Sequence, residues 1–94
     1  MLTLVAEIVA EPSAANQLNP LLEQLVGQTR KEYGCISYEL YQESETHFLM
    51  FEEWIDQAAL DKHMASAHFA EFNAAATQSN LLQQVKIRYL SRLN

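Results

Sequence analysis

The sequence has little of what several common protein classes require. Its one cysteine, Cys35, rules out an intrachain disulfide, which fits a reducing compartment, so we expect a cytoplasmic protein. Its two glycines, Gly27 and Gly34, do not form a phosphate-binding loop, which argues against a nucleotide or flavin bound by the usual fingerprint. No apolar run approaches the roughly 20 residues of a membrane span. The N-terminal apolar stretch contains Glu7 and lacks a basic flank, so it predicts a strand and not a signal peptide.

Positive charge is also scarce. Six Lys and Arg stand against twelve Asp and Glu, for a formal net charge of −6. Nucleic acids and anionic membranes bind clustered basic residues, so neither is an expected partner. Hydrophobic residues make up 49% of the chain, which is enough for one core in 94 residues. We therefore expect residues 1–94 to form a single domain.

Hydrophobic periodicity predicts four strands. Apolar residues alternate or cluster over residues 2–9, 35–42, 47–54 and 82–90, and the polar stretch 43–46 predicts a hairpin turn. Helical spacing predicts one helix between the first two strands and a second, broken helix between the last two. The order βαββαβ is that of the ferredoxin-like α+β fold, an antiparallel four-stranded sheet with helices on one face.

The first helix is expected over residues 13–33, with Gly34 following its C-terminus. Pro20 leaves its start open. Either Ser13 caps a helix that kinks near Pro20, or Asn19 caps one that begins at Pro20. We favour the earlier start. The second helix is expected from Gln57, with a break at residues 66–67 and a continuation over residues 68–78.

Strand parity divides the predicted sheet into two apolar faces. One face takes Leu4, Ala6, Ile8, Ile36, Tyr38, Leu40, Phe48, Met50, Glu52 and Trp54. The other takes Val5, Val9, Tyr41, Leu49, Phe51 and Ile55, with Glu7, Glu39, Glu53, Lys86 and Arg88. Helices can cover only one face, and an apolar face of several hundred Å² is rare on a monomer. A second copy of the chain is the simplest cover, so we expect a homodimer.

Three side chains on the first face carry polar groups that are costly to bury: Tyr38, Glu52 and Trp54. Each needs hydrogen-bond partners when it is buried. His63 shares a helix face with Leu60 and Met64, so it is expected to point at the same space. This convergence predicts a small-molecule pocket between helices and sheet, and the alternative of plain core residues stays open.

Other chemistries are disfavoured by spacing. His63 and His68 are five residues apart, about 140° around one continuous helix, and no third ligand is evident, so we expect no metal site. Cys35 lies at a strand start without a patterned histidine and is interpreted as a small buried residue.

The segments Tyr33–Leu40, Phe51–Trp54, Ala59–His63 and Ser66–Phe69 occur in an order and spacing that resembles the signature of the antibiotic-biosynthesis monooxygenase (ABM) family. The resemblance covers nearly the whole chain. Within the family the chain is most similar to the small quinol monooxygenases and to the autoinducer-processing isomerases. The resemblance implies a dimeric α+β barrel with one pocket per subunit between sheet and helices.

The resemblance also implies that O₂ oxidises a small electron-rich aromatic substrate without metal, flavin or any other cofactor. His63 is then expected to act as base, Tyr38 to donate to a developing oxyanion, and Glu52 to orient His63 or another pocket group. Trp54, Met64, Phe69 and Phe72 are the expected substrate-binding residues.

Two alternatives stay open, an isomerase and a non-catalytic ligand-binding module. A heme function is disfavoured, because the family's heme-degrading members carry a Trp where His63 stands and a heme-ligating His where this chain has Asn73.

Overall fold

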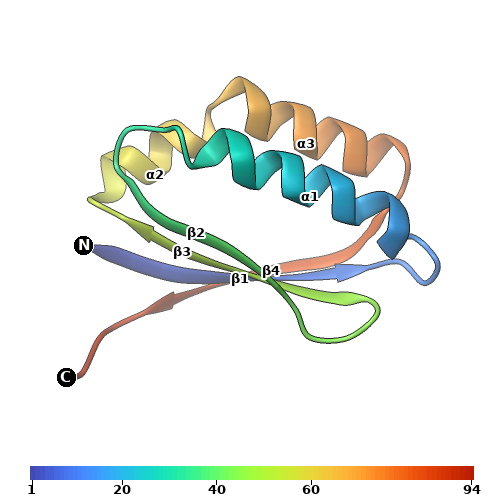
Figure 1. The fold of residues 1–94 in the computed structure, drawn as a ribbon, viewed down its shortest axis with the longest axis horizontal. Helices are drawn as coiled ribbons and strands as arrows, with labels where there is room; N and C mark the ends of the chain where they lie inside the picture. Colours follow the sequence, from blue (N-terminus) through green and yellow to red (C-terminus); the bar gives the residue numbers. More distant parts are fainter.

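The computed structural model describes residues 1–94 as a four-stranded antiparallel sheet with three helices over one face (Figure 1). The elements are β1 (Leu2–Ala10), α1 (Ala15–Thr29), β2 (Cys35–Gln42), β3 (His47–Trp54), α2 (Gln57–Met64), α3 (Ala67–Gln78) and β4 (Leu82–Leu90). The strand order is β2-β3-β1-β4. The predicted ferredoxin-like fold is confirmed, with every strand within one residue of its predicted bounds. None of the three helices has the length and apolarity that a membrane span requires.

Helix α1 starts early, as predicted, and contains Pro20 in its interior. The predicted Ser13 cap was wrong, because Ala14 is the N-cap residue and Ser13 has a positive φ of 71°. The helix ends at Thr29, four residues before the predicted end. Its backbone then tightens into i→i+3 hydrogen bonds, such as that from the Glu32 amide to the Thr29 carbonyl. Tyr33, the last residue of the predicted helix, consequently lies outside α1 and is 84% exposed.

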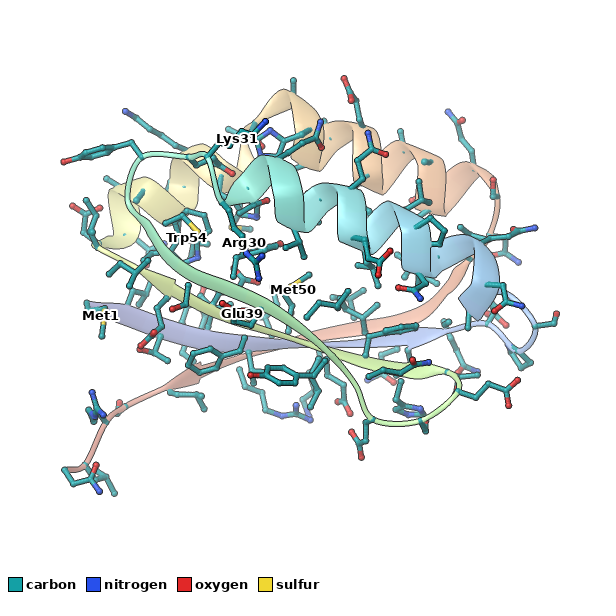
Figure 2. The ribbon with its side chains drawn as sticks, in the orientation of Figure 1. Met1, Arg30, Lys31, Glu39, Met50 and Trp54 are labelled. Atoms are coloured by element: carbon teal, nitrogen blue, oxygen red, sulfur yellow. The ribbon has the colours of Figure 1, made fainter.

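The first of the two predicted sheet faces packs against the helices. Figure 2 shows Met50 and Trp54 in the layer between sheet and helices, and both are fully buried. Ile36 is the exception, because it is 49% exposed. The β2–β3 register shifts between Cys35 and Ser37, so Ile36 is an extra residue in β2. Its side chain therefore does not follow the alternation that places Tyr38 on the helix side.

The second face has no helix over it. Its side chains include half-buried Val5, Leu49 and Phe51, and exposed Tyr41 and Ile55. The outer strand β4 is also poorly covered on the helix side. Val85, Ile87 and Tyr89 pair with buried β1 residues in register, yet each remains about half exposed.

Gly34 holds the loop after α1 against the start of α2. Its φ is +88°, and an added Cβ would lie 2.6 Å from the Cβ of Ala59 and 3.0 Å from Ile55 Cγ1. The Ile55 amide donates to the Gly34 carbonyl at 2.9 Å. Glycine is therefore required by both backbone conformation and close packing.

We expect Gly34→Ala to lower the free energy of unfolding by about 1–3 kcal/mol, because it adds left-handed strain and overpacking. The matched control is Gly27→Ala in α1, where nothing lies within 4 Å of an added Cβ. That change should raise stability by up to about 1 kcal/mol through helix propensity. Urea unfolding of both variants measures the difference, and equal stabilities would refute the role of Gly34.

Candidate active site

A mostly apolar cavity of about 80 Å³ lies between the sheet and the helices. Fifteen of its 18 lining residues are hydrophobic, so a few polar groups decide what it can bind. Six of the predicted site residues line it: Tyr38, Glu52, His63, Met64, Phe69 and Phe72. The seventh, Trp54, is fully buried and does not reach the cavity surface. The β4 residues Val85, Ile87 and Tyr89 complete the lining on the exposed side, a role the sequence analysis missed.

His63 lies at the centre of an aromatic cluster. Its ring centroid is 4.9 Å from those of Trp54 and Phe69 and 5.3 Å from that of Tyr38. These rings come from α2, α3 and both strands of the β2–β3 hairpin, and His63 itself is only 1% exposed. The imidazole is therefore held in one place by packing.

Each of the two ring nitrogens of that imidazole has a hydrogen-bond partner. Nδ1 lies 2.7 Å from Oε2 of Glu32, and Nε2 lies 3.4 Å from the Tyr38 hydroxyl. An ionised Glu32 can only accept, so Nδ1 carries the proton and donates to it. Nε2 is then the free acceptor, and the Tyr38 hydroxyl donates to it over a long, weak contact. The basic nitrogen of His63 thus faces the cavity wall that Tyr38 also lines.

Glu52 hydrogen-bonds to Trp54 and not to His63, the first of its two expected partners. It accepts a hydrogen bond from Trp54 Nε1 at 3.1 Å, and it lies directly opposite Tyr38 in the β2–β3 register. The residue that orients His63 is Glu32. Trp54, expected to bind the substrate, instead packs against His63 and donates a hydrogen bond to Glu52.

Burial changes the pKa values of His63, Glu52 and Tyr38. It lowers the pKa of His63, against an opposing effect of Glu32, and so favours the neutral imidazole, which can accept a proton. It raises the pKa of Glu52 to about 7, with the Trp54 hydrogen bond opposing. Burial and the charge of Glu52 raise the pKa of Tyr38, so its hydroxyl remains a donor. A base and a donor therefore sit side by side.

Two neighbours of His63 were missed by the sequence analysis, Glu32 and His68. Oε2 of Glu32 lies 2.7 Å from both His63 Nδ1 and His68 Nε2. The angular argument against a joint His63–His68 site was wrong, because it holds only for one continuous helix. The Ser66 side chain caps α3 by accepting from the Phe69 amide, and the chain changes direction between the two histidines. The Glu, His, His set has the ligand types of a metal site.

Cys35 and Thr29 complete the surroundings. Burial, with added repulsion from Glu32, raises the pKa of the Cys35 thiol to about 11, which disfavours a reactive thiolate. Thr29 is fully buried and its hydroxyl has no hydrogen-bond partner.

Comparison with known proteins shows the family to which this chain belongs. A family model described as antibiotic biosynthesis monooxygenase matches residues 1–75. The chain belongs to the antibiotic biosynthesis monooxygenase family. This confirms the resemblance found in the sequence, and the matched region contains every predicted site residue.

Individual relatives and solved structures agree with this assignment. "Putative monooxygenase Rv0793" of Mycobacterium tuberculosis is 34% identical over 71 residues, which are 74% of this chain and 70% of that protein. The crystal structure of PA3566 from Pseudomonas aeruginosa is 42% identical, covers 99% of this chain and 94% of its own, and superposes with a TM-score of 0.91. A further crystal structure, described as an antibiotic biosynthesis monooxygenase, is 32% identical over the full length of both chains, with a TM-score of 0.89.

Proposed function

We propose that this chain is a cofactor-independent monooxygenase that oxidises a small electron-rich aromatic substrate, quinol-like or anthrone-like, with O₂. The observation that carries the proposal is the pairing of His63 Nε2 with the Tyr38 hydroxyl on the wall of an apolar cavity. Their contact is long at 3.4 Å, so a substrate hydroxyl can replace it. The substrate would donate to His63 and accept from Tyr38 through the same oxygen.

In this proposal His63 starts the reaction by removing a proton from the substrate. Glu32 stabilises the imidazolium that forms, and Tyr38 stabilises the substrate anion. The electron-rich anion can reduce O₂ in one-electron steps, which forms a C–O bond and a peroxide that takes the proton back from His63. Loss of water then breaks the O–O bond and the remaining C–H bond. One oxygen atom ends in a carbonyl and the other in water, and the substrate supplies all four electrons.

The apolar wall serves the same chemistry by keeping water from the reactive intermediate. Met64, Phe69 and Phe72 would pack against the substrate ring, since they line the cavity near His63. Because the closed part of the cavity is small, a substrate larger than one ring would extend through the opening along β4.

Oxygen uptake with a panel of quinols and anthrones, with and without a chelator, tests the proposal. Uptake that survives chelation, with equimolar formation of the oxidised product, is the expected result. Rearranged substrate without uptake would replace the oxygenase by an isomerase, in which His63 and Tyr38 only move protons. Binding with neither reaction would leave a ligand-binding module.

We also propose that the chain works as a homodimer, with the two sheets face to face. The face opposite the helices carries half-buried Val5, Leu49 and Phe51 beside exposed Tyr41 and Ile55, and nothing in the chain covers it. A second sheet would remove this apolar surface from water. Sedimentation at micromolar concentration should then give about twice the 10.7 kDa chain mass.

We expect Phe51→Glu to convert the dimer to monomer, because it places an unpaired charge in a desolvated contact between sheets. Ala58→Glu is the matched control, since it adds the same charge on the exposed surface of α2. The control should remain dimeric. A Phe51→Glu variant that sediments with the mass of two chains would show that this face is not the interface.

A further inference from the structure

Three side chains from separate parts of the chain converge just outside the cavity. Glu32 comes from the loop after α1, His63 from the end of α2 and His68 from the first turn of α3. Their Oε2, Nδ1 and Nε2 atoms all lie within 4.8 Å of one another, and both contacts of the carboxylate are 2.7 Å. His63 is buried, whereas Glu32 and His68 are partly exposed, so the cluster can be reached from solvent.

The three donor atoms are of the types that bind divalent transition-metal ions. Two imidazole nitrogens and one carboxylate oxygen bind divalent transition metals, and three such ligands with a fourth position open are typical of non-structural Zn²⁺ sites. Bonds of about 2.0–2.1 Å in tetrahedral geometry place donor atoms about 3.3 Å apart. The two 2.7 Å contacts would have to open by roughly 0.6 Å, a small movement for a partly exposed Glu32.

The cluster also has an outer contact of the kind that metal sites use. The second ring nitrogen of His63, Nε2, faces the Tyr38 hydroxyl at 3.4 Å. Such contacts fix the orientation of a ligating imidazole. The net charge of −6 favours cations over anions as ligands of the chain as a whole.

We propose that Glu32, His63 and His68 form a binding site for a divalent transition-metal ion of the Zn²⁺ type, and that the bound ion inhibits the enzyme. The metal ion would take the Nδ1 lone pair of His63, and the ring proton would then reside on Nε2. That nitrogen can no longer accept a proton from a substrate. The inhibitory consequence rests on the proposed function, whereas the binding site does not.

Metal binding is measured directly on chelator-treated protein. Titration with Co²⁺ should give one equivalent of the visible absorption that low-coordinate Co²⁺ shows, and Zn²⁺ should displace it. His68→Asn and Glu32→Gln should each weaken binding by at least about tenfold, in line with the loss of metal-site contacts. His47→Asn, a histidine in the β2–β3 hairpin, is the control and should bind as the wild type does.

Two results would overturn the site: no saturable Co²⁺ binding by the wild type, or undiminished binding by His68→Asn. Circular dichroism establishes that each variant is folded, and His68→Asn decides the matter if Glu32→Gln does not fold. A hydrogen-bonded cluster with a purely structural role would give the first result.

Inhibition is measured by oxygen uptake in the presence of Zn²⁺ and after its removal by chelator. The wild type should lose uptake as the site fills and recover it on chelation. His68→Asn should keep its uptake at the same Zn²⁺ concentration, because the base His63 and its partner Glu32 are intact. A filled site with unchanged uptake would overturn the inhibitory role. If no substrate is oxidised at all, the proposed function fails, and the Co²⁺ titration still decides the metal site.

Discussion

The His63→Gln variant is expected to oxidise its substrate about 10²–10⁴-fold more slowly than the wild type, the range for loss of a positioned general base. The side chain is held by packing against Trp54, Phe69 and Tyr38, and its Nδ1 is held by Glu32. Glutamine fills much of the same space but offers no basic nitrogen to the substrate. The rate should be measured in chelator, so that the metal content of the two proteins is the same.

The competing explanation, that His63 is only a core residue, predicts a different pair of results. His63→Gln would then lower the free energy of unfolding by roughly 1–3 kcal/mol, the cost of disturbing a buried polar group, and leave turnover per folded molecule unchanged. Thermal melting and oxygen uptake on one preparation separate the two cases. His47→Gln is the matched control and should change neither. An early-melting His63→Gln protein with normal turnover would move the role of base to another cavity residue.

Glu52→Gln is expected to stabilise the protein by about 3 kcal/mol at pH 8 and to leave its stability unchanged near pH 4.5. Burial raises the pKa of Glu52 from 4.5 to about 7. That shift is worth about 3 kcal/mol at 1.36 kcal/mol per pH unit. Because the folded-state pKa is the higher one, the folded protein binds the proton more tightly. The wild-type protein therefore has its full stability below pH 4.5, where Glu52 is protonated, and loses this contribution as the pH rises through 7.

The amide is a good replacement because it cannot ionise and its oxygen still accepts from Trp54 Nε1. Urea unfolding at pH 4.5 and pH 8, for wild type and Glu52→Gln, measures the difference. A wild-type protein that is as stable as the variant at pH 8 would show that Glu52 is not strained by its burial. A measured cost of this size would be typical of an ionisable carboxyl retained for function.

Much of the fold could be predicted from the sequence, because local patterns encode it. Alternation with period two defined the four strands to within one residue, and it sorted Tyr38, Glu52 and Trp54 onto one face. Helical spacing likewise predicted that His63 points into the core. Parity failed at Ile36, where a register shift adds one residue to β2. Such an irregularity depends on the partner strand, and a single sequence carries no signal for it.

The chemistry of the site was decided by tertiary structure. Glu32 lies 31 residues from His63 and 36 from His68 along the chain, so no local period relates them. They meet because α1 ends early, the Gly34 turn packs on α2, and α3 leaves the line of α2 at Ser66. Hydrophobic periodicity reports which face of an element is buried, but it does not report which polar groups meet across that face. Residue type and parity therefore determined which side chains enter the core, and only the packing of the elements decided that Glu32 orients the base and that His68 joins it.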